Sequence, residues 1–179
     1  FDETNNIIYA EQMQAAGVEL IFGIPGLKVH SKICVIEKST QGKKRRYGFI
    51  STGNFNEDTA KVYTDYTLFT SNQKVLKEVN KVFSFLQVHY KFKAYKHLIV
   101  SPHHTHNTLV KMINKEIENH KIGLPSGIRL KLNAITNFSI IEKLYQASNE
   151  GVKIQMVVRG ICCLIPGIKG MSENIEVLS

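Results

Sequence analysis

The chain has 179 residues, 43% of them hydrophobic and 21% charged, which is typical of a folded globular protein and excludes an intrinsically disordered one. Its 23 Lys and Arg residues outnumber 15 Asp and Glu residues, and the formal net charge of +8 favours polyanionic partners such as nucleic acid, anionic lipid or nucleotide. No apolar run reaches the roughly 18 residues that a membrane-spanning helix needs, and the first residues do not resemble a signal peptide.

The three cysteines do not form a disulfide framework, because Cys162 and Cys163 are adjacent, a poor geometry for bridging each other, and Cys34 lies in the middle of a predicted strand. We expect all three to be reduced and buried in a cytosolic protein. The chain begins at Phe1 without a methionine and stops on the strand-like ENIEVLS, which predicts a piece of a longer protein.

Helical and extended patterns alternate along the chain. The predicted helices span residues 5–16, 57–63, 72–86, 107–120 and the first part of 140–161. The predicted strands span residues 18–24, 27–37, 46–51, 65–70, 97–101, 128–133 and the last part of 140–161. This alternation predicts an α/β fold with a mixed β-sheet flanked by helices.

Two longer features organise these elements. The connector STQGKKRR reads as an exposed hairpin loop between two strands, and residues 87–96 read as a connection without clear period. Residues 7–24 and 140–161 both read as helix, Gly-Val and strand, which leaves open whether the chain holds a duplication or a chance similarity. A boundary near residue 96 would divide the chain into residues 1–95 and 96–179.

The stretch LKVHSKICVIE carries the first candidate site residues, His30 and Lys32. On a strand they share one face with their Cβ atoms about 7 Å apart, so both can contact one phosphate-sized group. A neutral imidazole can attack phosphorus, and an adjacent ammonium can neutralise the phosphate oxygens. Taken alone, the pair is also explained as a histidine at a strand edge beside a solvated lysine.

The stretch STGNFN, after the next strand, predicts an anion-binding turn. Gly53 permits a tight turn, and backbone N–H groups of residues 52–54 could form a nest for an oxyanion. The side chains of Asn54 and Asn56 add amide donors. Because an antiparallel hairpin returns to its starting end, the turn should lie beside His30 and Lys32, and the convergence predicts a phosphate site.

His-x-Lys followed about twenty positions later by Gly and Asn residues resembles the phospholipase D superfamily, although Glu37 stands where that superfamily has an aspartate. Longer stretches resemble a more specific branch, the bacterial polyphosphate kinases that act through a phosphohistidine. These stretches are GLKVHSK, RRYGFISTGNFNEDTAKVYTDYTLFT, LPSGIRLKLN and GVKIQMVVRGICCLIPG with GMSENI. The resemblance covers essentially the whole chain.

This resemblance implies two phospholipase-D-like modules, residues 1–95 and 96–179, each truncated at its outer end. It implies reversible transfer of the terminal phosphate of ATP to polyphosphate through His30. Tyr63 matches a nucleotide-contacting tyrosine and Arg159 an arginine that contacts ATP. From the residues alone, Tyr63 is better explained as a core aromatic, and Arg159 is also explained as a surface arginine after a core strand.

The resemblance places the remaining active-site groups outside this chain. The second active-site histidine should follow Ser179, and the arginines associated with Mg²⁺ should precede Phe1, so no metal ligand is expected here. The cluster His103, His104 and His106 is compact enough to chelate a metal, but it lacks a carboxylate or cysteine ligand and is better explained as a polar loop.

Three functional hypotheses remain at this point: a polyphosphate kinase, a phosphodiesterase of the phospholipase D superfamily, and a module that binds polyanions without turnover. The expected partners are ATP or ADP and polyphosphate, and nucleic acid is not expected. The full-length protein is expected to be a cytoplasmic homo-oligomer for which peripheral association with a membrane stays open. This chain alone is expected to be inactive.

Overall fold

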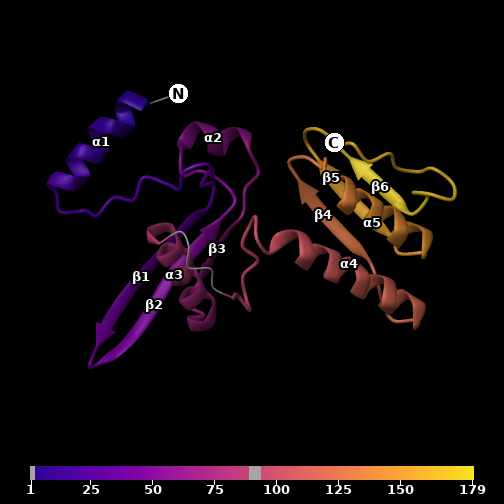
Figure 1. Cartoon of the computed structure of the whole chain (residues 1–179), viewed down its shortest axis with the longest axis horizontal. Helices are drawn as coiled ribbons and strands as arrows, with labels where there is room; N and C mark the ends of the chain where they lie inside the picture. The colour runs from indigo at the N-terminus through magenta and orange to yellow at the C-terminus, as the bar shows by residue number, and fades with distance from the viewer. Residues whose placement is uncertain (1–2, 89–93) are drawn as a thin grey trace. The chain divides into compact units, whose positions relative to one another are not determined.

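The computed structural model describes residues 3–88 and 94–179, and the chain forms two compact units, Phe1–Leu98 and Ile99–Ser179 (Figure 1). Each unit contains a three-stranded sheet, in the order β1-β2-β3 in the first unit and β4-β5-β6 in the second. The first sheet is antiparallel and the second is parallel. The α/β class is therefore confirmed, with the two kinds of strand pairing divided between the units.

The first unit contains three helices and three strands among its described residues. They are α1 (Glu3–Ala15), β1 (Lys32–Thr40), β2 (Lys43–Ser51), α2 (Glu57–Val62), β3 (Thr67–Thr70) and α3 (Gln73–Gln87). Gly17 follows α1 with a φ of +82°, as the predicted C-terminal glycine cap requires. Asn72 caps α3 as predicted, because its side-chain oxygen accepts hydrogen bonds from the N–H groups of Lys74 and Val75.

The hairpin of β1 and β2 is longer than the sequence pattern predicted. Its register runs from Lys32 opposite Ser51 to Thr40 opposite Lys43. Only Gln41 and Gly42 remain in the turn, with φ values of 50° and 73°, as expected for a two-residue hairpin turn with positive φ at both positions. The predicted exposed hairpin is therefore confirmed, but the predicted loop STQGKKRR is too long, because its basic residues lie on β2.

Helix α3 packs against one face of this hairpin (Figure 1). Leu76 and Val79 of α3 are fully buried there. A Cβ atom on Gly48 of β2 would lie 3.0 Å from Leu76 Cδ2 and would overlap the carbonyl oxygen of Cys34. Glycine at position 48 therefore lets the helix and the two strands approach one another.

The predicted strand at 97–101 is wrong, because a buried carboxylate takes the backbone hydrogen bonds of this segment. Glu78 on α3 is only 5% exposed and accepts hydrogen bonds from the N–H groups of Lys96, His97 and Leu98, at 2.8, 2.9 and 3.0 Å. These amides have a carboxylate partner and do not form a strand ladder. The predicted connection at 87–96 falls partly outside the described residues.

The predicted strand at 18–24 is also wrong. Within the described residues this segment forms only an isolated β-bridge between Ile24 and Leu27, and Phe22 is 77% exposed. An apolar run becomes a strand only when a neighbouring strand supplies hydrogen-bond partners. The similarity between 7–24 and 140–161 therefore extends to the helix but not to the strand.

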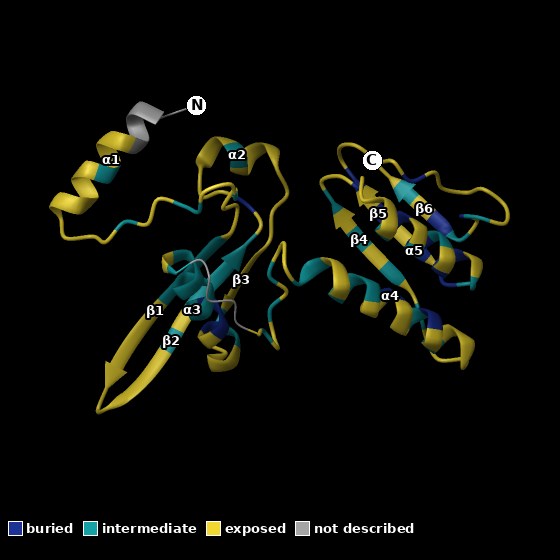
Figure 2. Ribbon diagram, viewed as in Figure 1, coloured by how far each residue is buried: buried dark blue, intermediate teal, exposed yellow. Residues whose placement is uncertain are grey.

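The second unit follows the predicted elements closely. It contains α4 (Thr105–Lys121), β4 (Ile128–Leu132), α5 (Phe138–Asn149), β5 (Ile154–Val158) and β6 (Ile175–Leu178). Exposure alternates along β4, as predicted for residues 128–133, and β5 alternates between buried and exposed residues. Helices α4 and α5 contribute buried Ile113, Ile117, Ile141 and Leu144 to the same core as the inward residues of β5 (Figure 2).

The expectation of buried cysteines is wrong. Cys162 and Cys163 are exposed and Cys34 is partly buried, and all three are free thiols. The backbone of Cys162 forms an isolated parallel β-bridge with that of Ile135. Ile135 belongs to the core of the second unit and Cys162 does not. In the described part of the chain, no helix has the length and apolar character needed to cross a membrane.

Candidate functional site

His30 and Lys32 lie at the end of the hairpin away from its turn. Lys32 begins β1 opposite Ser51, and its ammonium nitrogen Nζ donates a hydrogen bond to the carbonyl oxygen of His30 at 2.8 Å. His30 is exposed and precedes the strand, so the prediction that both residues alternate along one strand is wrong. The hydrogen bond from the Lys32 side chain to the His30 backbone nevertheless keeps the lysine ammonium close to His30.

The turn after β2 is held by residues 65–67, which lead into and begin β3. Thr52 donates from its hydroxyl oxygen Oγ1 to Asp65 Oδ1 at 2.9 Å, and the same hydroxyl accepts from the backbone N–H of Tyr66 at 3.0 Å. Ser51 Oγ lies 2.8 Å from Thr67 Oγ1. These bonds clamp the turn that follows β2 to the segment that leads into β3.

Gly53 is buried in this turn because the carboxylate of Asp65 lies directly against it. A Cβ atom at position 53 would overlap the carboxyl group of Asp65. The φ of Gly53 is not in the left-handed region, so the glycine is required for space and not for backbone conformation.

The predicted nest of backbone donors is wrong for two of its three amides. The N–H of Thr52 donates to the carbonyl oxygen of Tyr66 at 3.0 Å, and the N–H of Gly53 donates to Ser51 Oγ at 3.3 Å. These donors stabilise the turn and are not free to bind an oxyanion. Side chains, and not the backbone, must therefore supply most of the ligand contacts at this turn.

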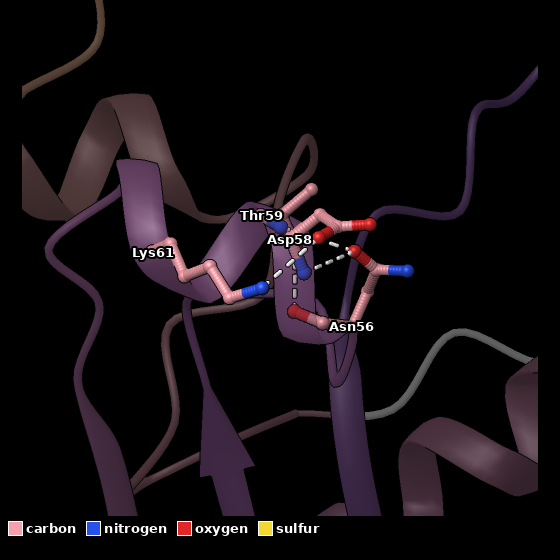
Figure 3. A network of polar contacts seen from close by, with 4 residues as sticks. All are labelled: Asn56, Asp58, Thr59 and Lys61. Atoms are coloured by element: carbon pink, nitrogen blue, oxygen red, sulfur yellow. Dashed lines mark hydrogen bonds and ion pairs between the residues drawn. The ribbon is translucent and has the colours of Figure 1, made fainter.

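Asn56 also differs from its predicted role, because its side-chain oxygen caps α2. Oδ1 accepts hydrogen bonds from the N–H groups of Asp58 and Thr59 at 3.1 and 3.0 Å (Figure 3). Lys61 pairs with Asp58 on the same short helix, at 3.3 Å. The amide nitrogen of Asn56 is directed away from α2 in Figure 3, so its two N–H donors are the part of this side chain that faces outward.

Three of the predicted site residues line one hollow next to the turn. The hollow has a volume of about 430 Å³, and Asn54, Asn56 and Tyr63 are among its lining residues, together with Phe55 and Asp65. Tyr63 follows α2 directly and is 45% exposed, while Phe55 is 67% exposed. The alternative of a core position for Tyr63 is therefore excluded, and aromatic and amide groups share an accessible concave surface.

Glu37, at the position of the superfamily aspartate, belongs to the other face of the hairpin. Its carboxylate pairs with Lys44 at 2.9 Å and with Arg46 at 2.8 Å. The hydrogen bond from Lys44, together with the charges of Lys44 and Arg46, lowers the pKa of Glu37 despite some desolvation. Glu37 lies about 16 Å along the strand from Lys32, too far to act with His30 as a catalytic acid.

Arg159 immediately follows β5 in the second unit and is exposed. Its backbone N–H lies 3.4 Å from the carbonyl oxygen of Leu132, the last residue of β4. Arg159 therefore stands at the carboxyl edge of the parallel strands, the edge at which open α/β sheets bind their ligands.

The histidine cluster at the start of α4 does not assemble a metal centre. His106 Nε2 lies 2.6 Å from Ser139 Oγ at the start of α5. Among residues 3–88 and 94–179 no group of three or more His, Cys, Asp and Glu side chains could hold a metal ion. His106 instead links the first turns of two helices.

The first unit thus places Asn54, Asn56 and Tyr63 around one hollow. Lys32, the first residue of β1, is paired with Ser51 next to the same turn. Sequence reasoning missed Asp65, Ser51 and Thr67, which hold the turn. A usable signal was present for Asp65, because it lies in the YTDY stretch beside Tyr63. Nothing in the local pattern indicated that its carboxylate would lie against Gly53.

Family models account for the two units separately. The model described as polyphosphate kinase C-terminal domain 1 matches residues 1–92, and the model described as polyphosphate kinase C-terminal domain 2 matches residues 98–179. Together they account for nearly the whole chain.

Individual proteins give the same result. The chain is 44% identical to the polyphosphate kinase of Escherichia coli K12 and 42% identical to that of Vibrio cholerae, in both cases over all 179 residues and 26% of the relative's length. The crystal structure of polyphosphate kinase from Porphyromonas gingivalis superimposes with a TM-score of 0.85 and 36% identity, over 99% of this chain and 29% of that one. The chain spans about a quarter of the length of the curated relatives it matches. It belongs to the polyphosphate kinase family and contains its phospholipase-D-like C-terminal domains.

Proposed function

We propose that this chain is the part of an ATP:polyphosphate phosphotransferase that carries the phosphorylated histidine, His30. Membership of the polyphosphate kinase family supports the reaction class. The observation that carries the site is the hairpin register, which sets Lys32 opposite Ser51 and so brings the His30–Lys32 end of β1 to the turn that lines the hollow.

In the proposed reaction, an unprotonated ring nitrogen of His30 attacks the γ-phosphorus of ATP in line with the bond to the leaving oxygen. The bond between that phosphorus and the β–γ bridging oxygen breaks, and ADP leaves with its electron pair. A terminal oxygen of polyphosphate then attacks the phosphohistidine, and the P–N bond breaks with its electron pair returning to the ring nitrogen. Both steps are reversible, because the phosphoryl group stays transferable.

Other residues of the two units have separate roles in this proposal. The ammonium of Lys32, held at the carbonyl of His30, neutralises charge that develops on the phosphoryl oxygens. Tyr63 contacts the nucleotide, and the side-chain amides of Asn54 and Asn56, which both line the hollow, donate to phosphate oxygens there. Arg159 supplies a guanidinium that can hold two phosphate oxygens at once.

Magnesium accompanies ATP in this proposal and shields its phosphate charges. Among the described residues no group of three or more His, Cys, Asp and Glu side chains could hold a metal ion by itself. We expect its ligands to lie outside this chain. A cytoplasmic location and a homo-oligomeric full-length protein remain predictions.

The test is labelling of the full-length protein with ATP that carries radioactive phosphorus at the γ position. We expect an acid-labile, base-stable protein phosphate that His30→Ala abolishes. His97→Ala is the matched control, because His97 is exposed and its hydrogen bond to Glu78 comes from the backbone N–H, which the substitution keeps. A His30→Ala protein that still takes up acid-labile label would show that the nucleophile is wrongly assigned.

A further inference from the structure

The half of the β1–β2 hairpin that contains the turn at Gln41 and Gly42 carries basic residues on both faces, but more of them on one face than on the other. Directly paired residues of antiparallel strands project on the same side of the sheet, and side chains alternate along each strand. Lys38 is paired with Arg45, and Thr40 is paired with Lys43. Lys38, Arg45 and Lys43 therefore share one side of the hairpin, which we call the basic face.

The opposite face carries the acidic residue of this hairpin. Glu37 is paired with Arg46 in the register and forms ion pairs with both Arg46 and Lys44. Both cations of that face are therefore ion-paired with one carboxylate, which offsets one of their two charges. This is also the face on which Leu76 of α3 lies against Gly48.

The basic face has no such neutralisation. Within the described residues no ion pair involves Lys38, Lys43 or Arg45, and β1 and β2 place no acidic residue on this side. All three residues are exposed, and the hairpin extends past α3 into solvent (Figure 2). Three uncompensated cations thus lie together on a rigid two-stranded ribbon.

The same face leads to the proposed catalytic end of the hairpin. Lys32 lies on the side of β1 that Lys38 occupies, six residues away, which is about 20 Å along a strand. Ile36 and Tyr47 lie between them on this face and are 61% and 43% exposed. A ligand that contacts both cationic ends must therefore be extended and carry negative charge at both of its ends.

We propose that the basic face binds the extended chain of inorganic polyphosphate and leads its reacting end toward Lys32 and His30. The inference rests on the proposed function for the catalytic end, and it adds a polyphosphate-binding surface on the hairpin. Polyphosphate carries about one negative charge for each phosphate unit, so a long chain spans both cationic ends at once. ATP and tripolyphosphate are too short to do so.

Binding measurements on the full-length protein test this surface. The basic-face variant combines Lys38→Gln, Lys43→Gln and Arg45→Gln, and the matched control combines Lys111→Gln, Lys115→Gln and Lys169→Gln, which removes the same charge from exposed lysines of the second unit. Affinities for long-chain polyphosphate and for tripolyphosphate are measured over a series of salt concentrations, and the thermal unfolding of each variant is recorded.

The basic-face variant should bind long-chain polyphosphate about tenfold or more weakly at low salt, with a shallower dependence of affinity on salt, because fewer counterions are released. Its affinity for tripolyphosphate and its labelling by ATP should be unchanged, and the control should behave as the unaltered protein. Charge reversal by Arg45→Glu alone should weaken long-chain binding in the same direction.

Equal weakening in the control variant, or unchanged long-chain affinity in a folded basic-face variant, would overturn the inference. It would also be overturned if single-stranded RNA competed as effectively as polyphosphate of equal charge, because the face would then bind polyanions in general. Absence of label on His30 in the unaltered protein would contradict the proposed function instead, and the polyphosphate affinities would still decide the role of this face.

Discussion

Gly53 and Asp65 show how one missing side chain can shape the candidate site. The carboxylate of Asp65 occupies the space that a Cβ atom at position 53 would need, and the same carboxylate accepts a hydrogen bond from Thr52. The turn beside Lys32 therefore depends on a close contact between residues that are distant in sequence.

This contact predicts the effect of Gly53→Ala. The substitution should lower the free energy of unfolding by about 1–3 kcal/mol, because the new methyl group displaces Asp65. In an Asp65→Ala background the same substitution should cost clearly less, since the overlapping group is absent. Urea unfolding of the four proteins of this double-mutant cycle measures the coupling.

Gly127→Ala is the control for this cycle, because a Cβ at position 127 would only approach the carbonyl oxygen of Lys153 at an ordinary 3.6 Å. Equal costs of Gly53→Ala with and without the Asp65 carboxylate would show that the contact does not explain the glycine.

Glu78 is the second residue whose chemistry depends on its surroundings. Burial alone would raise the pKa of its carboxyl group, but hydrogen bonds from the N–H groups of Lys96, His97 and Leu98 outweigh burial, and the pKa is lowered. A pKa that is lower in the folded state stabilises the fold above the carboxyl pKa of the unfolded chain. This stabilisation is lost as the pH falls through the folded pKa.

Glu78→Gln should therefore destabilise the protein near neutral pH by about 2–3 kcal/mol, because three N–H groups lose a charged acceptor. The difference in unfolding free energy between the two proteins should become smaller as the pH falls below the ordinary pKa of a glutamate, because the unaltered protein then also loses the charge of Glu78. Unfolding free energies measured as a function of pH for both proteins test this. A difference that stays constant in acid would contradict the proposed role of the charge.

At the scale of elements, α2 depends on a residue that also belongs to the hollow. Asn56 caps the helix through its side-chain oxygen while its amide nitrogen is directed away from the helix (Figure 3). The two functions use different atoms and can be separated by substitution.

Asn56→Asp should keep the cap, since aspartate is an equally good N-cap residue, while the nucleotide affinity of the full-length protein should fall because a carboxylate replaces an amide donor. Asn56→Ala should lose the cap as well, at about 1 kcal/mol. Thermal unfolding and ATP titration separate the two effects. An Asn56→Asp protein with unchanged ATP affinity would restrict this residue to capping.

At the scale of the whole molecule, burial is concentrated in the second unit. The buried hydrophobic cluster draws all its members from Ile113 to Ile175, and it is completed by β5 at the centre of the parallel sheet (Figure 2). In the first unit the buried hydrophobic residues among those described are Leu76 and Val79. The two units should therefore differ in local stability.

Native-state hydrogen exchange should show this difference directly. The amides of β5 should exchange most slowly, because opening them requires loss of the core, and those near Gln41 and Gly42 should exchange fastest. Leu144→Ala should destabilise the second unit by about 2–5 kcal/mol and accelerate exchange in β5, with little change in the hairpin. Faster amide hydrogen exchange in β5 than in the β1–β2 hairpin would contradict this ranking.

The sequence by itself determined the elements whose signals are local, because helix caps and periodicities depend on neighbouring residues only. Asn72 marks the start of α3, Gly17 follows α1, and alternation identifies β4. The motifs around His30, Tyr63 and Arg159 likewise indicated the polyphosphate kinase family, which the comparisons confirm.

The tertiary structure decided what depends on partners that are distant in sequence. Residues 18–24 and 97–101 looked like strands, yet one has no paired strand among the described residues and the other gives its amides to Glu78. The contact of Asp65 with Gly53 and the uncompensated charge of Lys38 and Arg45 exist only because chain folding sets the strand register. Hydrogen bonds and close contacts form between surfaces that meet in space, and a local pattern does not specify which surfaces meet.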